Sequence, residues 1–465
     1  MSLTDSTTTT TTTNSDDNSV KGGEKPEEYQ GEDDRRSEKR KKLEAAWARL
    51  PNCPFYAAMK AFFKFGCCLG LIYKLLPGTS RRRKVLQAAY VATVLGLFLA
   101  SELSAIMNFD LRNEGLNSVT SMKLLCLSYF TMALGSHLCT LFVHPRLPLL
   151  LKPLMRNTIT KVVRVPREGR LRRISNICWI VAVVFTLINI PCLFMGQVGL
   201  VKLPFVPTLV PFIPEGLYWP DALLLFFVTN GNLFSVSLYM LLCLIVIHEA
   251  EDLCNEMALR CNEEEEQEES QQKSKTIISR EYLFPVRAYH RRYQTIYECS
   301  QLLNGLYNPY LIFLYAIYVP CSLFCIYATV RDPNMDFMTA LVFCFWLAMI
   351  SFQIVMATLP AIAIYEAGDK IADSAYKMYH HSCRKSTINP AELHLFSTQL
   401  ISNHLYISAG GFFVITRSFV LTLFSAVSTY FVVLMQFDLT GSPNSSASSS
   451  SDGQKAVAAT TVLLT

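Results

Sequence analysis

Charge is scarce in this chain: Asp, Glu, Lys and Arg make up 17% of its residues, whereas 51% are hydrophobic. Soluble domains carry about 25% charged residues, so this composition excludes a chain built from soluble domains. The charged residues that are present lie in blocks between long apolar stretches. This distribution predicts a multi-pass membrane protein whose helices cross a lipid bilayer.

Motifs for catalysis and for metal binding are also lacking. The chain has 15 cysteines, but no CxxC pair recurs at the spacing of a zinc site. No HExxH motif, phosphate-binding glycine loop, nucleophile elbow or pair of catalytic carboxylates occurs in an apolar stretch. The acidic run 263–269 has neither the glycine nor the alternating ligands of a calcium loop. We expect no enzyme activity, metal, cofactor or nucleic-acid partner.

The two ends of the chain are polar and of low complexity. Residues 1–53 contain a threonine tract and charged runs, which predict a disordered cytoplasmic tail without a secretory signal. Residues 438–465 are rich in serine and predict a disordered extracellular tail, in which Asn444 is a candidate glycosylation site. Between the first tail and the first span, the apolar residues 54–84 carry spaced lysines. That pattern predicts an amphipathic segment in the membrane interface.

Seven apolar stretches approach the length of about 20 residues that a bilayer requires. They are residues 85–107, 120–143, 174–195, 222–247, 310–330, 337–365 and 412–437. The expected fold is therefore an all-α membrane protein with seven transmembrane helices and one transmembrane domain, 85–437.

Lysine and arginine counts predict the orientation of these helices. The connection between the second and third spans holds nine, that between the fourth and fifth seven, and that between the sixth and seventh four. The alternate connections and the C-terminal tail hold one each. Positive charge marks the cytoplasmic side, so the N-terminus is expected inside the cell and the C-terminus outside. This is the reverse of a G-protein-coupled receptor.

The long connections 248–306 and 366–409 are assigned to the cytoplasm by this count. The first carries apolar residues at helical spacing, among them Tyr289, Tyr293 and Ile296. Such periodicity predicts amphipathic helices that extend the spans into an intracellular bundle.

The last span carries polar side chains among its aliphatic residues. Ser425, Thr429 and Gln436 fall near one helical face, at steps of four and seven. A polar stripe on a transmembrane helix indicates a face turned to water or to protein rather than to lipid.

The end of this span carries a family resemblance. Residues 429–437, TYFVVLMQF, follow the pattern of Thr-Tyr, five apolar residues and Gln-Phe. Upstream stand FSTQL at 396–400 and GGFF at 410–413. Together these resemble the C-terminal signature of insect gustatory receptors. The resemblance covers about residues 390–437.

This resemblance implies a function. The chain would be a ligand-gated, non-selective cation channel, similar in plan to insect odorant receptors, in the plasma membrane of sensory neurons. It would detect a small tastant such as a sugar or a bitter compound. It would also form a homo- or heterotetramer whose pore is lined by the last helix of each subunit.

The same resemblance assigns roles at the end of the last helix. Gln436 and Phe437 would form the outer constriction, where a ring of Phe side chains stops ions by dewetting. Thr429 and Tyr430 would brace the helix against its neighbours through hydrogen bonds. The alternative is an amide at the membrane interface beside an anchoring aromatic ring.

A ligand pocket is expected among the outer halves of the second to sixth spans. Aromatic rings with a few amides suit a sugar or a small polar organic ligand. The candidates are Tyr129, Asn189, Asn230, Asn232, Tyr318, Tyr327 and Trp346. Core packing or a helix–helix hydrogen bond would equally account for each of them alone.

Two alternatives remain open at this point. A multi-pass transporter is consistent with Pro320 and Pro360, which are expected to break the fifth and sixth spans. A heteromeric chemoreceptor subunit without a pocket of its own is the second.

Overall fold

The structure is a computed structural model that describes Ala45 and residues 54–72, 80–107, 118–151, 165–197, 219–271, 284–331, 336–385 and 390–440. Its contacts divide the chain into Met1–Ala45 and Ala46–Thr465, and everything below concerns the second unit. Most of the two predicted tails, including Asn444, lies outside the described residues.

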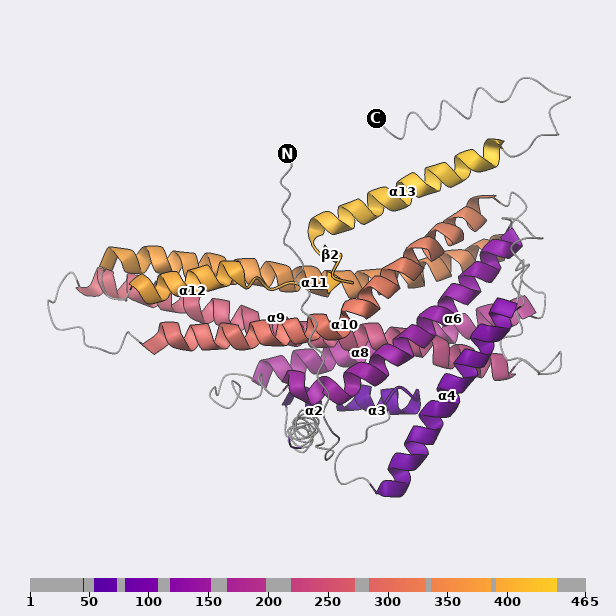
Figure 1. Ribbon diagram of the computed structural model, residues 1–465, viewed down its shortest axis with the longest axis horizontal. Coiled ribbons are helices and arrows are strands. Elements are labelled where there is room, and N and C mark those ends of the chain that lie inside the picture. Colours follow the sequence, from indigo (N-terminus) through magenta and orange to yellow (C-terminus); the bar gives the residue numbers. More distant parts are fainter. Residues whose placement is uncertain are drawn as a thin grey trace, which may run out of the picture. The chain divides into compact units, whose positions relative to one another are not determined.

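Helices form nearly all of the described unit, and the first six spans expected from the sequence each fall within one (Figure 1). The elements are α2 (Pro54–Ala58), α3 (Lys60–Cys68), α4 (Arg81–Met107), α6 (Ser118–Val143), η2 (His144–Arg146), α8 (Val165–Gln197), α9 (Trp219–Gln271), α10 (Phe284–Arg331), α11 (Phe337–Lys385), α12 (Pro390–Ser402), β1 (Ser408–Ala409), β2 (Phe413–Val414) and α13 (Arg417–Thr440).

Helix α9 is the centre of the bundle. It contacts α6, α8, α10 and α11, and 83% of its most apolar stretch is buried. Helix α4 lies at the periphery and contacts α6, with only 22% of its apolar stretch buried. A helix that is apolar on every face packs in the interior of a bundle. The apolar part of α9 accordingly has no continuous polar face in its sequence.

Within the described ranges, six helices are long and apolar enough to cross a membrane: α4, α6 and α8 to α11. In the seventh expected span the helix begins at Arg417, about five residues later than the expected start. Its apolar part among the described residues is the shorter Arg417–Val433. The structure therefore establishes an all-helical protein with six candidate spans, to which α13 is added as a proposal.

A β-hairpin explains the late start of α13. Gly410 and Gly411 have φ angles of 63° and 73°, in the left-handed region that glycine adopts without steric cost. They form the turn between β1 and β2, which pair antiparallel with Ala409 opposite Phe413. Since a helix cannot pass through two left-handed residues, the apolar run is divided into a hairpin and a helix.

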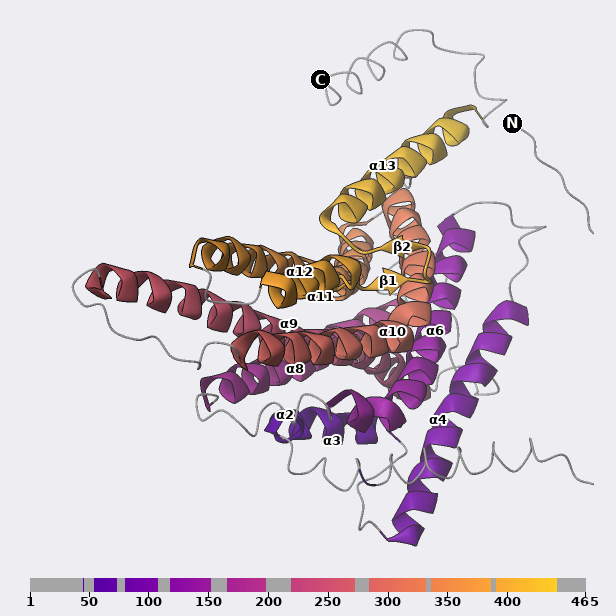
Figure 2. The ribbon, with the colours of Figure 1, turned by 60° about the vertical axis from the view of Figure 1, so that its left-hand side comes forward.

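The hairpin is fixed to α10 by two asparagine side chains. Asn304 Oδ1 accepts the backbone N–H of Ser408 at 2.9 Å, and Asn308 Oδ1 accepts that of Gly411 at 2.8 Å. Immediately afterwards Arg417 Nε donates to Glu366 of α11 at 2.5 Å. These contacts set the point at which α13 leaves the bundle, and the helix leads away from the other elements in both views (Figures 1 and 2).

The segment before the first span packs against protein. Phe62 of α3 stacks on Phe234 of α9 with ring centroids 4.2 Å apart, and Phe63 meets His144 of η2 edge to face. Lys60 and Lys64 lie on the exposed side of α3. The segment is amphipathic, and its apolar side packs against the helical bundle. Its location in the membrane interface remains a prediction.

Three helices continue beyond the apolar region and run side by side with α12 (Figures 1 and 2). Helix α9 extends to Gln271, α10 begins at Phe284, α11 extends to Lys385, and α12 packs on α11. The expected breaks at Pro320 and Pro360 are wrong, because α10 and α11 continue through both prolines. The transporter alternative loses this support.

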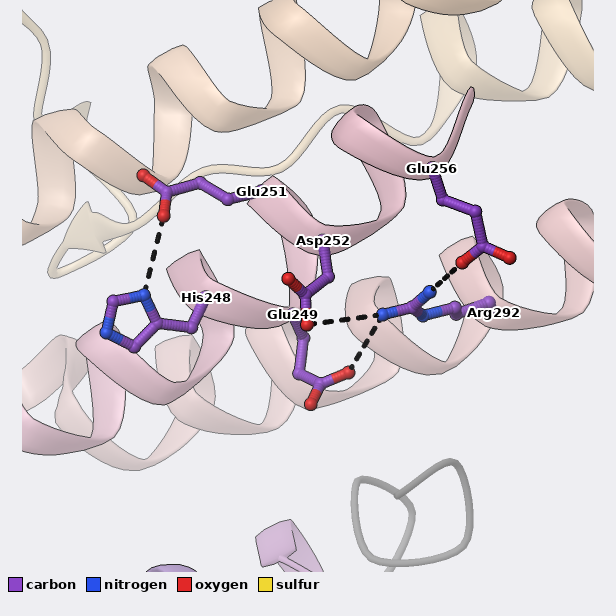
Figure 3. A network of polar contacts seen from close by, with 6 residues as sticks. All are labelled: His248, Glu249, Glu251, Asp252, Glu256 and Arg292. Carbon is purple, nitrogen blue, oxygen red and sulfur yellow. Dashed lines mark hydrogen bonds and ion pairs between the residues drawn. The ribbon is translucent and has the colours of Figure 1, made fainter. Parts of the chain in front are cut away.

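One arginine joins α9 to α10 in the extended region (Figure 3). Arg292 of α10 donates to Glu256 at 2.7 Å and lies 3.5 Å from Glu249 and 3.7 Å from Asp252. The three carboxylates occupy one face of α9 at steps of three and four residues. On the same turn of α9, His248 pairs with Glu251 at 3.4 Å.

Candidate functional site

A polar network joins four helices within the bundle, and Thr229 of α9 is at its centre. The Thr229 hydroxyl accepts hydrogen bonds from Tyr129 Oη of α6 and from Asn189 Nδ2 of α8, each at 3.0 Å. Asn189 Oδ1 in turn accepts the indole N–H of Trp346 on α11 at 3.0 Å. Tyr129 Oη also lies 3.8 Å from the sulfur of Met349. Three of the seven pocket candidates, Tyr129, Asn189 and Trp346, therefore meet in one place.

The other two asparagine candidates form hydrogen bonds with partners outside this network. Asn230 Nδ2 donates to Thr186 of α8 at 2.7 Å and to the Phe226 carbonyl at 2.8 Å. Asn232 Oδ1 accepts the Ser136 hydroxyl of α6 at 2.9 Å, and Ser136 Oγ lies 3.4 Å from Tyr310 Oη. Both asparagines are fully buried and tie α9 to a neighbouring helix.

Two tyrosine candidates lie on α10. Tyr318 donates to Gln353 Oε1 of α11 at 2.7 Å, and its side chain is 1% exposed. Tyr327 is buried two turns further along the helix. The seven candidates thus cover a layer between α6, α8, α9, α10 and α11 rather than one compact cluster.

Most polar atoms of the network already form hydrogen bonds within the protein. Both polar atoms of the Asn189 amide are occupied by protein partners, and Thr229 accepts two donors. Three buried amide atoms nearby have no hydrogen-bond partner: Asn230 Oδ1, Asn232 Nδ2 and Gln353 Nε2. A bound molecule would therefore find aromatic and thioether surface with few free polar atoms, since an amide that is already paired gains little from a new partner.

Sequence reasoning missed Thr229 and Met349. Thr229 directly precedes Asn230 and Gly231 in the polar interruption TNGN of an otherwise apolar helix, which is the signal that marks it. A methionine in an apolar helix gives no comparable signal, because it is equally typical of ordinary core packing.

The four pore candidates lie on α13. Thr429 donates to the Ser425 carbonyl of its own helix at 2.9 Å, and Tyr430 is 62% exposed. Gln436 is exposed near the end of the helix, whereas Phe437 is described by its backbone alone. In the described part of this single chain, Thr429 and Tyr430 show no bracing bond to another helix. Their assigned roles remain predictions that require a neighbouring subunit.

The described residues hold no cluster of three or more His, Cys, Asp or Glu side chains arranged for a metal ion. Outside the spans, burial raises the pKa of the Cys67 thiol to about 11. The thiol stays protonated near neutral pH and is a poor nucleophile. No catalytic arrangement is assembled around the network or α13 within the described residues.

Comparison with known proteins identifies the family. Residues 59–441 match the family described as 7tm Chemosensory receptor, and this range contains every described helix from α3 to α13. Two relatives come from Caenorhabditis elegans. High-energy light unresponsive protein 1 is 29% identical over 150 residues, 32% of this chain and 34% of that protein. Gustatory receptor family protein 3 is 28% identical over 149 residues, 31% of this chain and 33% of that protein. The chain thus matches about a third of the length of either relative.

The fold matches solved structures of the insect olfactory receptor OR5 from Machilis hrabei. The complex with eugenol superposes with a TM-score of 0.63 at 14% identity, over 82% of this chain and 99% of that one. A second structure of the same receptor gives 0.57 at 16% identity, over 81% and 98%. The expected resemblance to gustatory receptors and the expected likeness to insect odorant receptors are confirmed. The chain is a multi-pass membrane protein of a receptor rather than an enzyme family: it belongs to the 7tm chemosensory receptor family.

Proposed function

We propose that this chain is a subunit of a ligand-gated, non-selective cation channel in the plasma membrane of sensory neurons, opened by a small organic tastant. The observation that carries the proposal is the exposure of the α13 side chains. Its side chains are unusually exposed for an apolar helix: Leu421 and Phe424 are each 72% exposed. In a membrane, such a helix is covered either by lipid or by neighbouring subunits.

The polar stripe favours neighbouring subunits around a water-filled path. Ser425 and Thr429 are exposed on the same side of α13, and Gln436 follows two turns later. Hydroxyl and amide side chains facing lipid are unfavourable, whereas facing a pore they replace part of an ion's hydration shell. One helix cannot enclose a pore, so the channel is a homo- or heterotetramer with α13 of each subunit at the centre. Gln436 and Phe437 then form the outer constriction.

The ligand site of the proposal is the network around Thr229. It joins α6, α8, α9 and α11, so a ligand that separates Trp346 from Asn189 changes the packing of all four helices. Because the polar atoms of the network are largely paired with each other, the surface suits a small aromatic or weakly polar molecule better than a polyhydroxylated sugar. The related olfactory receptor was solved with eugenol, a small organic molecule, which agrees with this class.

Whole-cell recording from cells that express this chain alone tests the proposal. The panel contains sugars, bitter compounds, phenolics and a short-wavelength light pulse, because the two nematode relatives carry names that refer to light and to taste. We expect an inward cation current with at least one chemical, absent from untransfected cells and reduced by Trp346→Ala. A chemical response that appears only when a second receptor chain is co-expressed would identify the heteromeric alternative. Transport of a labelled substrate without channel current would contradict the proposal.

A further inference from the structure

Helix α4 carries a buried carboxyl group that the proposed channel does not use. Glu102 lies in the apolar stretch Arg81–Ser104 and is 9% exposed. One turn before it, Phe98 packs into the cluster of Phe130, Ala133, Leu224 and Val228, so this side of α4 faces the bundle. An ionisable side chain that is buried between apolar helices is costly and marks a functional site unless a partner neutralises it.

The partner of Glu102 is the hydroxyl of Thr131 on α6. Thr131 Oγ1 contacts Glu102 Oε1 and lies 2.9 Å from the Leu127 carbonyl. A threonine hydroxyl has one proton and therefore donates to one acceptor at a time. If Glu102 were ionised, one of these two acceptors would be left without a proton. Both contacts are satisfied when Glu102 carries the proton and donates it to Thr131 Oγ1, while Thr131 donates to Leu127.

The surroundings of Glu102 also favour the neutral form. Its second oxygen, Oε2, and the adjacent Ser101 hydroxyl are buried and have no hydrogen-bond partner. Among the described residues no ion pair joins Glu102 to a cation. A carboxylate with one bare oxygen in an apolar layer costs several kcal/mol, on the order of the penalty for an unpaired buried charge. Protonation removes that cost.

Other titratable and charged groups lie on the elements around α4. On α6 these are Lys123, Cys126, Tyr129, His137 and Cys139, on α9 Asp221, and on α3 Lys60, Lys64, Cys67 and Cys68. His137 contacts α4 directly, because its ring meets Phe98 edge to face with centroids 4.5 Å apart. Its Nδ1 lies 3.0 Å from the Ala133 carbonyl, to which it donates.

We propose that Glu102 is a proton-binding site that joins α4 to α6. The proton comes from water and returns to it, and no bond other than O–H forms or breaks. In the protonated form both hydrogen bonds of the chain Glu102–Thr131–Leu127 have a proton. Loss of the proton leaves an unpaired acceptor and a buried charge between two helices. Helix α4 is the least buried of the candidate spans, and this contact is one of those that join it to the bundle. The pH thus determines the stability of the contact between α4 and α6, whichever ligand the receptor detects.

Infrared difference spectroscopy of the purified full chain in detergent tests the protonation directly. A protonated carboxyl group has a C=O stretching band above the amide I band, and a carboxylate does not. We expect this band in the parent at neutral pH, its loss at alkaline pH, and its absence from Glu102→Gln. Asp221→Asn, which removes the other buried carboxyl group near α4, should keep the band. A parent without the band, or a Glu102→Gln variant that retains it, would overturn the proposal. Neither result depends on channel activity.

Thermal unfolding tests the consequence for stability. The unfolding temperature of the parent should fall as the pH rises from mildly acidic to mildly alkaline, because the paired form requires the proton. The unfolding temperature of Glu102→Gln should fall much less, because its amide donates to Thr131 at every pH. Thr131→Ser should behave like the parent, and Thr131→Val should shift the frequency of the carboxyl band because the proton has lost its acceptor. If the pH dependence disappears in His137→Asn and persists in Glu102→Gln, the titrating group is His137 and the assignment is wrong.

Discussion

Arg292 of α10 and Glu249 of α9 form an ion pair at 3.5 Å in which the carboxylate side chain is 3% exposed. The same guanidinium group donates to Glu256, so one cation serves carboxylates on successive turns of α9. A buried pair of this kind contributes little net stability while it is intact, but losing one partner leaves an uncompensated charge. Arg292 therefore links α9 to α10, because separating the two helices would break its ion pairs.

Arg292→Ala should lower the free energy of unfolding by about 3–5 kcal/mol, because the buried Glu249 carboxylate loses its ion pair with Arg292. The measurement is the thermal unfolding midpoint of the purified chain, together with the yield of monodisperse protein. Arg291→Ala is the matched control, since Arg291 is exposed on the same turn. Equal midpoints for the two variants would show that the Arg292 network does not hold the helices together.

The hairpin offers a second comparison between neighbouring residues. A Cβ atom at Gly410 would lie 2.5 Å from Ile312 and 2.7 Å from the Phe412 ring, whereas at Gly411 the nearest atom is Asn308 Nδ2 at 3.9 Å. Both substitutions incur the left-handed backbone cost of about 1–2 kcal/mol. Gly410→Ala should therefore be clearly more destabilising than Gly411→Ala in the same unfolding measurement. The reverse order would contradict the described packing of the hairpin on α10.

Substitution of Thr229 isolates the polar network. Thr229→Val keeps the shape of the side chain but leaves the Tyr129 hydroxyl and the Asn189 amide without their acceptor, at a cost of about 1–3 kcal/mol. Thr229→Ser retains the hydroxyl and should unfold within a few degrees of the parent. Once an agonist is found, Thr229→Val should also shift its dose–response curve without changing basal current. Indistinguishable Val and Ser variants would mean that the network is not formed.

The orientation of the chain in the membrane is a prediction that follows from the lysine and arginine counts alone. A peptide tag on the C-terminus should be stained by antibody in unpermeabilised cells. A tag on the N-terminus should be stained only after permeabilisation. Staining in the reverse pattern would place the 248–306 and 366–409 extensions outside the cell and exclude the proposed channel topology.

The sequence predicts the helices better than their interruptions. The spans are found because an apolar run of about 20 residues with few charges is typical of a membrane-spanning helix. The extensions are found because Tyr293 and Ile296 repeat at helical spacing, and both are buried. The hairpin is missed because Phe413 and Val414 continue without a break into the apolar run of the seventh span. The glycine pair was the available signal for a turn.

The site is harder to predict because a central helix has neighbours on all sides. Thr229, Asn230 and Asn232 are close in sequence, yet they bond to different partners on α6 and α8. Composition identifies such a segment as polar and buried. Which side chains converge depends on the rotation of α9 against its neighbours, and a single sequence does not encode that rotation in its periodicity.

The most direct test of the central claim, that α13 lines a cation pore, is the whole-cell current of Phe437→Ala at surface expression matched to the parent. If Phe437 seals the closed pore by dewetting, its truncation should raise the basal current without any ligand, and Gln436→Ala should alter open-state current or ion permeability. Phe424→Ala, which removes a ring from the opposite side of the same helix, should leave the basal current unchanged. The claim is contradicted if Phe437→Ala and Gln436→Ala both conduct and gate like the parent.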